Sequence, residues 1–571
     1  MLTAVAGQPQ VPDLMPFQSS GPEQRCRKAV ESIRSLFSQG KTACVSFSAG
    51  KDSSAVMHLT VEAAREAKAN GQNPRVVVLS SDTGVENPEL ALLLRREHAK
   101  LRRVLARDSI SHDVIMTQPS LASSWAVRVL GGNKLPSFPG ASHECAIDFK
   151  VEPMRKARNA LFRRTGKDAV VTLLGTRYDE SVTRAHAMAS RQEVGHRPYR
   201  NDEGELVMSP LAFWTSDDVW ELLGLARSGA LASYSDFEDT FRLYADAGGT
   251  SCAVISDAIT EGVKAARGGC GARFGCFTCV AVSCDRSLAA MVESDQQYAY
   301  MAGLGRLRDH IALARYDYSK RYWVHRGISA QGVKLEPDCF SPAFLLELFR
   351  YAASLDYEER QAARRDGHRP RFQLLSRQAV VVIDALWSLN GFHPPHTALL
   401  EWRSISEGKT HFPVPVPSTS GSLPQRFPKA LWVAADATWD GSRHELAGGF
   451  LDVETMLADP CVPVETRADG RAIPTFQTER RMEVDIESLE MALDFEWDAI
   501  LERHRAAAGD WTSGYRFWTQ FGTLSLTPAQ TGEHDKILRR TAWRARNGFL
   551  GEKGNQKAQA MACEAQSHKR P

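Results

Sequence analysis

Short apolar runs alternate with amphipathic segments along the first half of the chain. The runs typical of buried strands are residues 42–47, 75–80, 112–116 and 168–174. The amphipathic segments, whose apolar residues recur at helical spacing, are 25–38, 54–69 and 88–106. Because strands alternate with helices, the pattern predicts an α/β fold with a doubly wound parallel sheet.

The second half of the chain has a different pattern. From residue 301 to 410 the apolar residues follow helical spacing, most clearly over 341–355 and 372–389. We therefore predict a mainly helical C-terminal region. The stretch 411–427, rich in Pro, Ser and Thr, has the composition of a linker.

Composition narrows the class of protein. A length of 571 residues allows roughly three or four domains, and the hydrophobic and charged fractions of 43% and 24% are those of a globular protein. No apolar run is long enough to cross a bilayer, and the first residues lack the pattern of a secretion signal. We therefore expect a cytoplasmic protein with no membrane partner.

The charge balance says where a nucleic acid could bind. The net charge of +2 gives no overall basic field, so any such contact must come from local patches. One candidate is the basic run 360–371. The other is a basic tail that contains Arg539, Arg540, Arg544, Arg546, Lys553 and Lys557, with Trp543 among them. Either could be a phosphate-contacting patch or a solvated surface.

The residues Ser48-Ala49-Gly50-Lys51-Asp52-Ser53 connect the first predicted strand to a predicted helix. Small residues let a ligand approach the backbone, and free N–H groups at a helix N-terminus attract anions. Lys51 adds a positive charge, while Ser48 and Ser53 add hydroxyl donors. The stretch predicts a phosphate-binding loop, with an ordinary polar turn as the alternative. It differs from the Walker pattern, whose loop is longer and glycine-spaced.

Two further segments lie at the carboxyl ends of predicted strands, where open α/β sheets bind ligands. Asp82 and Thr83 follow the second strand, and Arg177 and Arg184 follow the fourth. Guanidinium groups suit phosphate or sulfate oxygens. The alternatives are that Asp82 caps a helix or turn and that the arginine segment is a solvated loop.

A long connection, residues 119–151, separates the third and fourth predicted strands. Connections of this length are usually functional or disordered. Near its end, Cys145 stands among polar and charged residues that include His143 and Lys150. These neighbours could activate the thiol as a nucleophile or sulfur carrier. An inert thiol or a metal-cluster ligand is the alternative.

Five of the eleven cysteines fall in one short region: Cys252, Cys270, Cys276, Cys279 and Cys284. A Cys-x-x-Cys pair with nearby cysteines and glycines can supply four thiolates to zinc or to a [4Fe–4S] cluster. We take the first four cysteines as the ligands, with Cys284 and Cys145 as reserve candidates. Spacing does not choose between the metals, although zinc sites more often pair two Cys-x-x-Cys motifs. Bunched cysteines without a secretion signal also favour a metal or redox site over disulfides.

Taken together, the motifs resemble a known family. The loop Ser48–Ser53 resembles the PP-loop of ATP pyrophosphatases, although Ala49 stands where that family usually has Gly. The change is mild unless this residue needs a positive φ. Four further segments follow in one order: Asp82–Glu86, Cys145–Lys150, Gly175–Arg184 and Arg273–Cys279. Over residues 25–300 the set resembles the DndC-type and SspD-type ATP pyrophosphatases of bacterial DNA phosphorothioation, which are related to phosphoadenylylsulfate reductases.

The resemblance implies ATP, Mg²⁺ and a [4Fe–4S] cluster as cofactors. ATP would bind at the loop with Asp82 and Thr83, and the cluster at Cys252, Cys270, Cys276 and Cys279. The residues implied in the chemistry are Lys51, Asp52, Cys145, Arg177 and Arg184. A DNA phosphate oxygen would be adenylated with release of pyrophosphate, then replaced by sulfur from the cluster or from a persulfide on Cys145. The implied partners are DNA, a cysteine desulfurase and other phosphorothioation proteins.

Two other functions stay open. A phosphoadenylylsulfate reductase would release sulfite from a sulfonucleotide without using ATP, and a tRNA thiolation enzyme would apply the same activation to RNA. The long second half and the lack of adjacent paired cysteines count against the reductase. The predicted divisions of the chain are a disordered lead (1–21), a PP-loop domain (22–240), an iron–sulfur segment (241–300), a helical region (301–410), a linker (411–427) and a C-terminal module with the basic tail (428–571).

Overall fold

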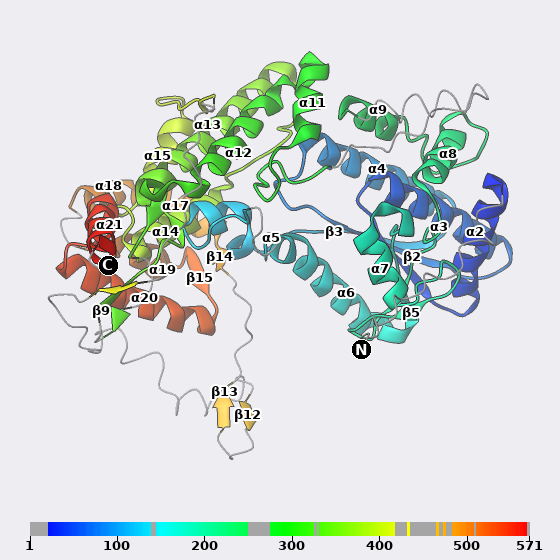
Figure 1. The fold of residues 1–571 in the computed structure, drawn as a ribbon, viewed down its shortest axis with the longest axis horizontal. Helices are drawn as coiled ribbons and strands as arrows, with labels where there is room; N and C mark the ends of the chain where they lie inside the picture. The colour runs from blue at the N-terminus through cyan, green and yellow to red at the C-terminus, as the bar shows by residue number, and fades with distance from the viewer. Residues whose placement is uncertain are drawn as a thin grey trace, which may run out of the picture. The chain divides into compact units, whose positions relative to one another are not determined.

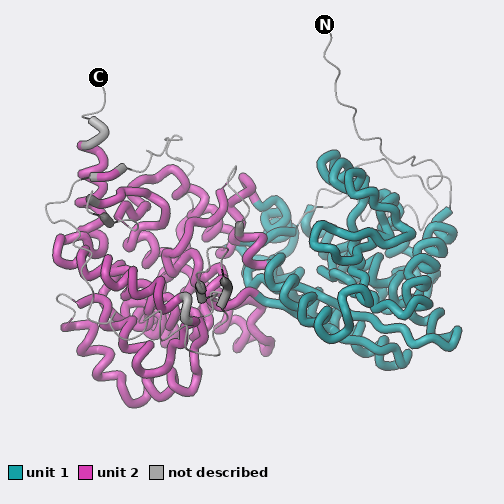
Figure 2. Tube along the Cα trace, turned by 90° about the horizontal axis from the view of Figure 1, so that it is seen from below, with its two compact units in different colours: residues 1–118, 150–277, 285–302 teal, residues 119–149, 278–284, 303–571 magenta. Residues whose placement is uncertain are grey.

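The computed structural model describes residues 21–138, 144–248, 274–324, 328–329, 332–416, 431–433, 464–466, 472–474, 482–506 and 510–567. The chain divides into two compact units, which Figure 2 draws in different colours. Unit 1 comprises residues 1–118, 150–277 and 285–302, and unit 2 comprises residues 119–149, 278–284 and 303–571. The predicted lead lies outside the described residues except for its last position.

Unit 1 contains the predicted alternation of strands and helices. Its strands are β1 (Thr42–Ser46), β2 (Arg75–Ser81), β3 (Ser111–Thr117), β4 (Val170–Leu173), β5 (Tyr199–Arg200) and β6 (Leu206–Met208). Its helices are α2 (Pro22–Ser38), α3 (Lys51–Ala69), α4 (Pro88–Arg107), α6 (Glu152–Thr165), α7 (Val182–Ser190), α8 (Ser216–Arg227), α9 (Glu238–Asp246) and α11 (Arg286–Ser294). The four predicted strands correspond to β1 to β4, and the three predicted helices to α2, α3 and α4.

A six-stranded sheet forms the centre of unit 1. Its strand order is β3-β2-β1-β4-β6-β5, and every neighbouring pair is parallel except β5 with β6. Strand β1 lies between β2 and β4, so that Val45 pairs with Val78 on one side and Leu173 on the other. Helices α2 and α3 pack against β1, and α6 packs against β2 (Figure 1). The predicted α/β fold with a parallel-dominated sheet is confirmed.

Local sequence explains where two of these helices begin. The Asn87 side chain caps α4 by accepting a hydrogen bond from the Glu89 N–H at 3.0 Å, and Pro88 occupies the first turn, where its missing N–H costs nothing. Thr215 and Asp218 form a reciprocal capping box at the start of α8. These caps satisfy backbone donors that the helices themselves leave without a partner.

Unit 2 is mainly helical. Its helices are α5 (Glu144–Ala146), α12 (Ala302–Leu313, which begins at the last residue of unit 1), α13 (Pro342–Asp366), α14 (Arg377–Asn390), α15 (Thr397–Ser406), α17 (Ile486–Phe495), α18 (Trp497–Arg505), α19 (Ser513–Gln520), α20 (Pro528–Arg546) and α21 (Gly551–Ser567). Its short strands are β7 (Arg321–Tyr322), β8 (Ile328–Ser329), β9 (Gly332–Leu335), β10 (Cys339–Phe340), β11 (Leu431–Val433), β12 (Val464–Thr466), β13 (Ala472–Pro474), β14 (Met482–Val484) and β15 (Leu524–Leu526). The predicted mainly helical C-terminal region is confirmed.

Helix α14 is the buried centre of unit 2. Its residues from Ala379 to Asn390 are all buried, and it packs against α15, α19 and α20. On this helix the buried Asp384 carboxylate accepts hydrogen bonds from Trp518 Nε1 at 2.7 Å and from the Ala398 N–H at 3.1 Å. These bonds join α14 to two of its neighbours and satisfy a charge that would otherwise be costly to bury. Within the described ranges, no helix is both long and apolar enough to cross a membrane.

The connection between β3 and β4 runs through unit 2. It contains a 3₁₀ turn, η1 (Leu121–Ser123), and two π-helical turns, η2 (Ala126–Leu130) and η3 (Ile147–Val151). Turn η2 packs against α14, where Trp387 Nε1 donates a hydrogen bond to the Leu130 carbonyl at 2.7 Å. At Gly132, φ is +75° and a Cβ atom would lie 2.4 Å from the Phe392 ring, so only glycine fits this turn. The segment predicted as part of the PP-loop domain thus belongs to unit 2 over residues 119–149.

The basic run 360–371 spans the end of α13 and the turn after it. The Arg371 guanidinium forms an ion pair with the buried Glu359 carboxylate at 2.8 Å, so its charge stabilises the fold of unit 2. Arg364 and Arg365 lie in the last helical turn, where they are exposed and where their charge suits the helix dipole. The run is therefore partly structural and partly a solvent-facing cationic surface.

The basic tail is a packed helix pair, α20 and α21. Trp543 is buried and stacks on Phe549 with ring centroids 5.8 Å apart. Arg544 is also buried and donates a hydrogen bond to the Thr541 hydroxyl at 2.9 Å. The predictions of a solvated tail or a nucleic-acid arm are wrong for Trp543 and Arg544, because both side chains lie in the folded interior of unit 2. Arg546, Lys553 and Lys557 are exposed, so for them the two predictions stay open.

Replacing Trp543 with Ala should lower the free energy of unfolding by about 3–5 kcal/mol, because the change leaves a cavity in place of a buried ring. Arg546→Ala changes an exposed residue of the same helix and should alter it by less than about 0.5 kcal/mol. Urea denaturation followed by near-ultraviolet circular dichroism would measure both. Equal effects of the two substitutions would contradict the packing of this helix pair.

Candidate functional site

The loop of residues 48–53 joins β1 to α3 as a strand–turn–helix unit. Gly50 is the N-cap of α3, so the first backbone N–H groups of the helix face the loop. The Ser48 and Ser53 hydroxyl oxygens lie 3.1 Å apart, and the Ser48 N–H donates to Ser53 Oγ at 3.2 Å. Hydroxyls and amides therefore meet at the positive end of a helix dipole, an arrangement that favours an anion.

Ala49 adopts the left-handed backbone conformation, with a φ of +57°, and is fully buried. A residue with a Cβ atom pays roughly 1–2 kcal/mol for this conformation, whereas glycine adopts it freely. Ala49 is the position at which the loop departs from the usual PP-loop pattern. The departure is therefore a strained one, and the strain is located in the loop that would hold phosphate.

Asp52 fixes two cations at this end of α3. Its carboxylate accepts hydrogen bonds from Lys51 Nζ at 2.9 Å and from Arg177 Nε at 2.7 Å. The Arg177 guanidinium is buried and also donates to the Trp214 carbonyl at 3.3 Å. A Cβ atom on Gly175 would lie 3.0 Å from the Asp52 backbone, so glycine permits the close approach of these segments. The predicted residues Lys51, Asp52 and Arg177 are thus brought together.

Arg184 has a different place. It lies in α7, exposed over about half of its side chain (47%), and forms an ion pair with Glu180. The same Glu180 side chain accepts a hydrogen bond from the Arg177 N–H at 3.1 Å. The structure therefore links Arg184 to the loop only through Glu180, while Arg177 contacts Asp52 directly.

The segment Asp82–Glu86 forms the turn that follows β2. Asp82 Oδ1 accepts a hydrogen bond from the Gly84 N–H at 2.9 Å, and its carboxylate lies 3.6 Å from the Arg95 guanidinium. This geometry is that of a turn-forming aspartate. Thr83 is buried beside Asp82, and its hydroxyl faces the thiol of Cys276.

Cys276 lies directly against this turn. Its Sγ atom is 3.7 Å from Thr83 Oγ1, although the two residues are 193 positions apart in the sequence. The backbones also pair: Cys276 forms a β-bridge with Glu86, and the Phe277 N–H donates to the Val85 carbonyl at 2.9 Å. A predicted metal-binding cysteine is thereby held at the carboxyl end of a strand next to β1.

Lys150 gives this thiol a cationic neighbour. Its ammonium group pairs with Glu86 Oε1 at 2.5 Å. Burial acts to lower the pKa of Lys150, but the negative charges of Glu86 and Cys276 outweigh burial and raise the pKa above its ordinary value. Lys150 therefore stays protonated beside the Cys276 thiol.

The remaining predicted metal ligands can be placed only in part. Cys252 and Cys270 lie outside the described residues. Cys279 is half-buried, and its carbonyl accepts a hydrogen bond from Arg308 Nε at 3.1 Å. Of the reserve candidates, Cys145 is half-buried and Cys284 is exposed. In the part of the chain that the structure describes, no three His, Cys, Asp or Glu side chains converge as a metal site. The described thiols Cys276 and Cys279 could supply two of the four thiolates that zinc or a [4Fe–4S] cluster requires.

Sequence reasoning missed Tyr244. This residue of α9 accepts a hydrogen bond from the Lys51 N–H through its hydroxyl at 3.3 Å, and its ring meets Phe274 edge-on at 5.2 Å. It therefore connects the phosphate-loop helix to the start of the described cysteine segment. No sequence signal marks it, because a tyrosine on an amphipathic helix is most often a packing residue.

One protein-family model matches part of the chain. Residues 42–227 match the family model of the phosphoadenosine phosphosulfate reductase domain. The match begins with β1, ends with α8 and includes the loop 48–53 and Arg177. This region is therefore similar to that reductase domain. Cys276 and most of unit 2 lie beyond the match.

Similarity to individual proteins is low. No curated protein matches the chain. Among solved structures, the chain is similar to NAD⁺ synthetase from Burkholderia pseudomallei, with 19% identity and a TM-score of 0.24 over 42% of this chain and 92% of that one. It is also similar to the U34-tRNA thiolase NcsA from Methanococcus maripaludis with its [4Fe-4S] cluster, with 14% identity and a TM-score of 0.23 over 43% of this chain and 81% of that one.

The strain at Ala49 predicts the effect of one substitution. Ala49→Gly should lower the free energy of unfolding by no more than about 0.5 kcal/mol, because relief of the positive φ offsets the lost methyl group. Ala55→Gly, which removes an equally buried methyl from the interior of α3, should lower it by about 1–2 kcal/mol. Thermal and urea unfolding would measure both. A loss for Ala49→Gly as large as for Ala55→Gly would contradict the strained conformation.

Proposed function

We propose that this protein is a PP-loop enzyme that cleaves ATP between its α- and β-phosphates and uses the activation to insert sulfur into the DNA backbone. The proposal rests on the position of Cys276, which contacts Thr83 through its thiol and pairs with Glu86 through its backbone. That turn follows β2, and the loop 48–53 follows the neighbouring parallel strand β1. A thiol at the same sheet edge as a nucleotide loop is what coupled activation and sulfur transfer require.

The loop residues account for the activation step. A phosphate oxygen of the acceptor attacks the α-phosphorus of ATP, and the electron pair of the broken P–O bond leaves with pyrophosphate. Lys51, Arg177 and the first amides of α3 stabilise the charge that develops on the leaving group. Asp52 keeps both cations in place, and Mg²⁺ would enter with ATP as its counter-ion.

The second step is a displacement at the acceptor phosphorus. A sulfur nucleophile at the oxidation level of sulfide forms a P–S bond, the P–O bond to AMP breaks, and AMP leaves with the electron pair. No net oxidation or reduction accompanies this exchange. Lys150, protonated beside Cys276, would hold a negatively charged sulfur near the activated phosphate.

A [4Fe–4S] cluster is consistent with the thiolate chemistry of the cysteine segment. We propose Cys276 and Cys279 as two ligands and Cys252 and Cys270 as the others. When bound, such a cluster supplies a place that can hold and release sulfide. Cys145, next to η3, stays the proposed alternative sulfur carrier. Sulfur held there as a persulfide would be released as sulfide by a second thiol, which is oxidised to a disulfide with Cys145.

DNA is proposed as the acceptor because the chain is much longer than the domain that a small-molecule enzyme of this type needs. The family match covers residues 42–227, while unit 2 adds a second compact body with exposed arginines at Arg364 and Arg365. A cysteine desulfurase and other phosphorothioation proteins would complete the system. The second candidate is a sulfonucleotide reductase, which the same family match supports; a tRNA thiolation enzyme would share the activation step.

Replacing Lys51 with Ala should lower pyrophosphate release from ATP roughly 100- to 1,000-fold, because one charged donor to the leaving group is lost. Lys68→Ala changes an exposed lysine in the last turn of the same helix and should leave the rate unchanged. A coupled pyrophosphate assay with duplex and single-stranded DNA as acceptors would measure both. Asp52→Ala is a less suitable variant, because it also removes the partner of the buried Arg177.

The products separate the candidate functions. Pyrophosphate that depends on DNA, together with sulfur retained in the DNA, supports the proposal. Sulfite released from phosphoadenylylsulfate without ATP would replace it with the reductase function. Release of inorganic phosphate in place of pyrophosphate would contradict the PP-loop assignment itself.

The metal is tested by anaerobic purification. The protein should contain about four irons per chain and show the brown colour of an iron–sulfur protein. Cys276→Ser should remove most of the iron and colour, because it removes a proposed ligand. Cys563→Ser changes an exposed cysteine near the end of the chain and should remove neither. Zinc in place of iron in anaerobic preparations would contradict the cluster.

A further inference from the structure

Unit 2 contains a pocket of about 520 Å³ whose lining includes no residue of the loop 48–53. Residues of η1, the turn after η2, α14, β14 and α20 surround it. Its volume lies within the range of about 300–1,000 Å³ typical of small-molecule sites. It is therefore large enough for a ligand of nucleotide size.

Two buried amides present fixed hydrogen-bonding groups to this pocket. Asn390 donates its Nδ2–H to the Leu386 carbonyl at 3.0 Å, which orients its Oδ1 as an acceptor. Gln530 accepts hydrogen bonds from Thr527 through Oε1, at 3.2 Å from the hydroxyl, which orients its Nε2 as a donor. Among the described residues, neither Asn390 Oδ1 nor Gln530 Nε2 has a hydrogen-bond partner. Both residues line the pocket, so Asn390 Oδ1 and Gln530 Nε2 are available to hydrogen-bond a ligand there.

The charges and apolar groups of the lining define the rest of the ligand. The lining contains the cations Arg128, Lys134 and Arg540 against the carboxylates Asp148 and Glu533. Arg128 is buried and ion-paired with Asp148. The lining also includes Leu386, Met482 and Ile537, whose side chains can cover the face of a flat ring. The pocket therefore combines a cationic part, an amide part and an apolar part.

From these features we infer that the pocket binds a nucleoside phosphate, at a site separate from the PP-loop. A nucleobase edge offers a donor beside an acceptor, which complements Asn390 Oδ1 and Gln530 Nε2, and the apolar side chains cover the base. Lys134 and Arg540 bind the phosphate. A free mononucleotide and a nucleotide within a single strand share this chemistry. The inference does not depend on the function proposed for the loop 48–53.

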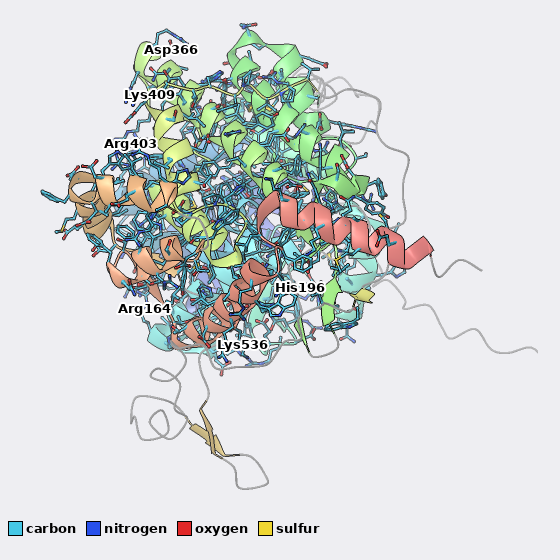
Figure 3. The ribbon with its side chains drawn as sticks, turned by 90° about the vertical axis from the view of Figure 1, so that its left-hand side faces the viewer. Arg164, His196, Asp366, Arg403, Lys409 and Lys536 are labelled. Atoms are coloured by element: carbon cyan, nitrogen blue, oxygen red, sulfur yellow. The ribbon has the colours of Figure 1, made fainter. Side chains whose placement is uncertain are left out.

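Isothermal titration of the full chain tests the site, with AMP, CMP, ribose 5-phosphate and a five-nucleotide deoxyoligonucleotide as probes. Lys134→Glu and Arg540→Glu should each weaken nucleotide binding at least tenfold, because each places a negative charge where the phosphate binds. Lys536→Glu makes the same change at an exposed lysine of α20, labelled in Figure 3, that does not line the pocket, and should change the affinity less than twofold. All titrations are made in the Lys51→Ala background, which weakens nucleotide binding at the PP-loop.

The outcomes decide the inference and the source of the ligand. Ribose 5-phosphate should bind at least tenfold more weakly than AMP, because it lacks the base. An oligonucleotide that binds at least tenfold more tightly than AMP, with the same sensitivity to Arg540→Glu, identifies a strand as the source; otherwise the ligand is a free nucleotide. The inference is overturned if no probe binds at millimolar concentration, if Lys536→Glu has the same effect as Arg540→Glu, or if ribose 5-phosphate binds as well as AMP. Circular dichroism checks that each variant folds, and Arg540→Gln replaces Arg540→Glu if the latter does not.

Discussion

The parallel pairing of β1 with both β2 and β4 determines where every candidate group of unit 1 can lie. Parallel strands end at the same edge of a sheet, so the segments that follow these three strands converge there. The loop 48–53 follows β1, the turn with Thr83 follows β2, and Arg177 follows β4. Loss of this register would separate the phosphate loop from the groups that complete it, even if each segment kept its local conformation.

Charge balance holds the site together on this edge. Asp52 accepts hydrogen bonds from Lys51 and from the buried Arg177, and Glu86 pairs with Lys150 beside Cys276. Each cation therefore has a carboxylate partner, which reduces the cost of placing positive charge close to a buried sheet edge. In the proposed function the same cations would also meet the polyphosphate of ATP, which would compete for them with the carboxylates. The strained Ala49 shows that the loop conformation is imposed by its surroundings.

Unit 2 depends on a different constraint, the burial of α14. This helix is buried on all sides from Ala379 to Asn390, so other elements must cover each of its faces. Helices α15, α19 and α20 cover part of it, and η2 of the long connection covers another part. The connection thereby leaves the parallel sheet and becomes part of the helical core. Its turn after η2 also supplies Lys134 to the pocket of unit 2.

Local sequence was sufficient to predict the strands β1 to β4, the helices α2 to α4 and the turn of residues 48–53 between β1 and α3, because apolar periodicity and small-residue turns are short-range signals. It could not reveal that Cys276 meets Thr83, because a contact between residues 193 positions apart depends on the folded sheet. The positive φ of Ala49 and the burial of Trp543 also depend on the folded structure, so the sequence could not predict them. A basic tail and a buried helix pair have similar compositions, and only packing against the rest of unit 2 distinguishes them.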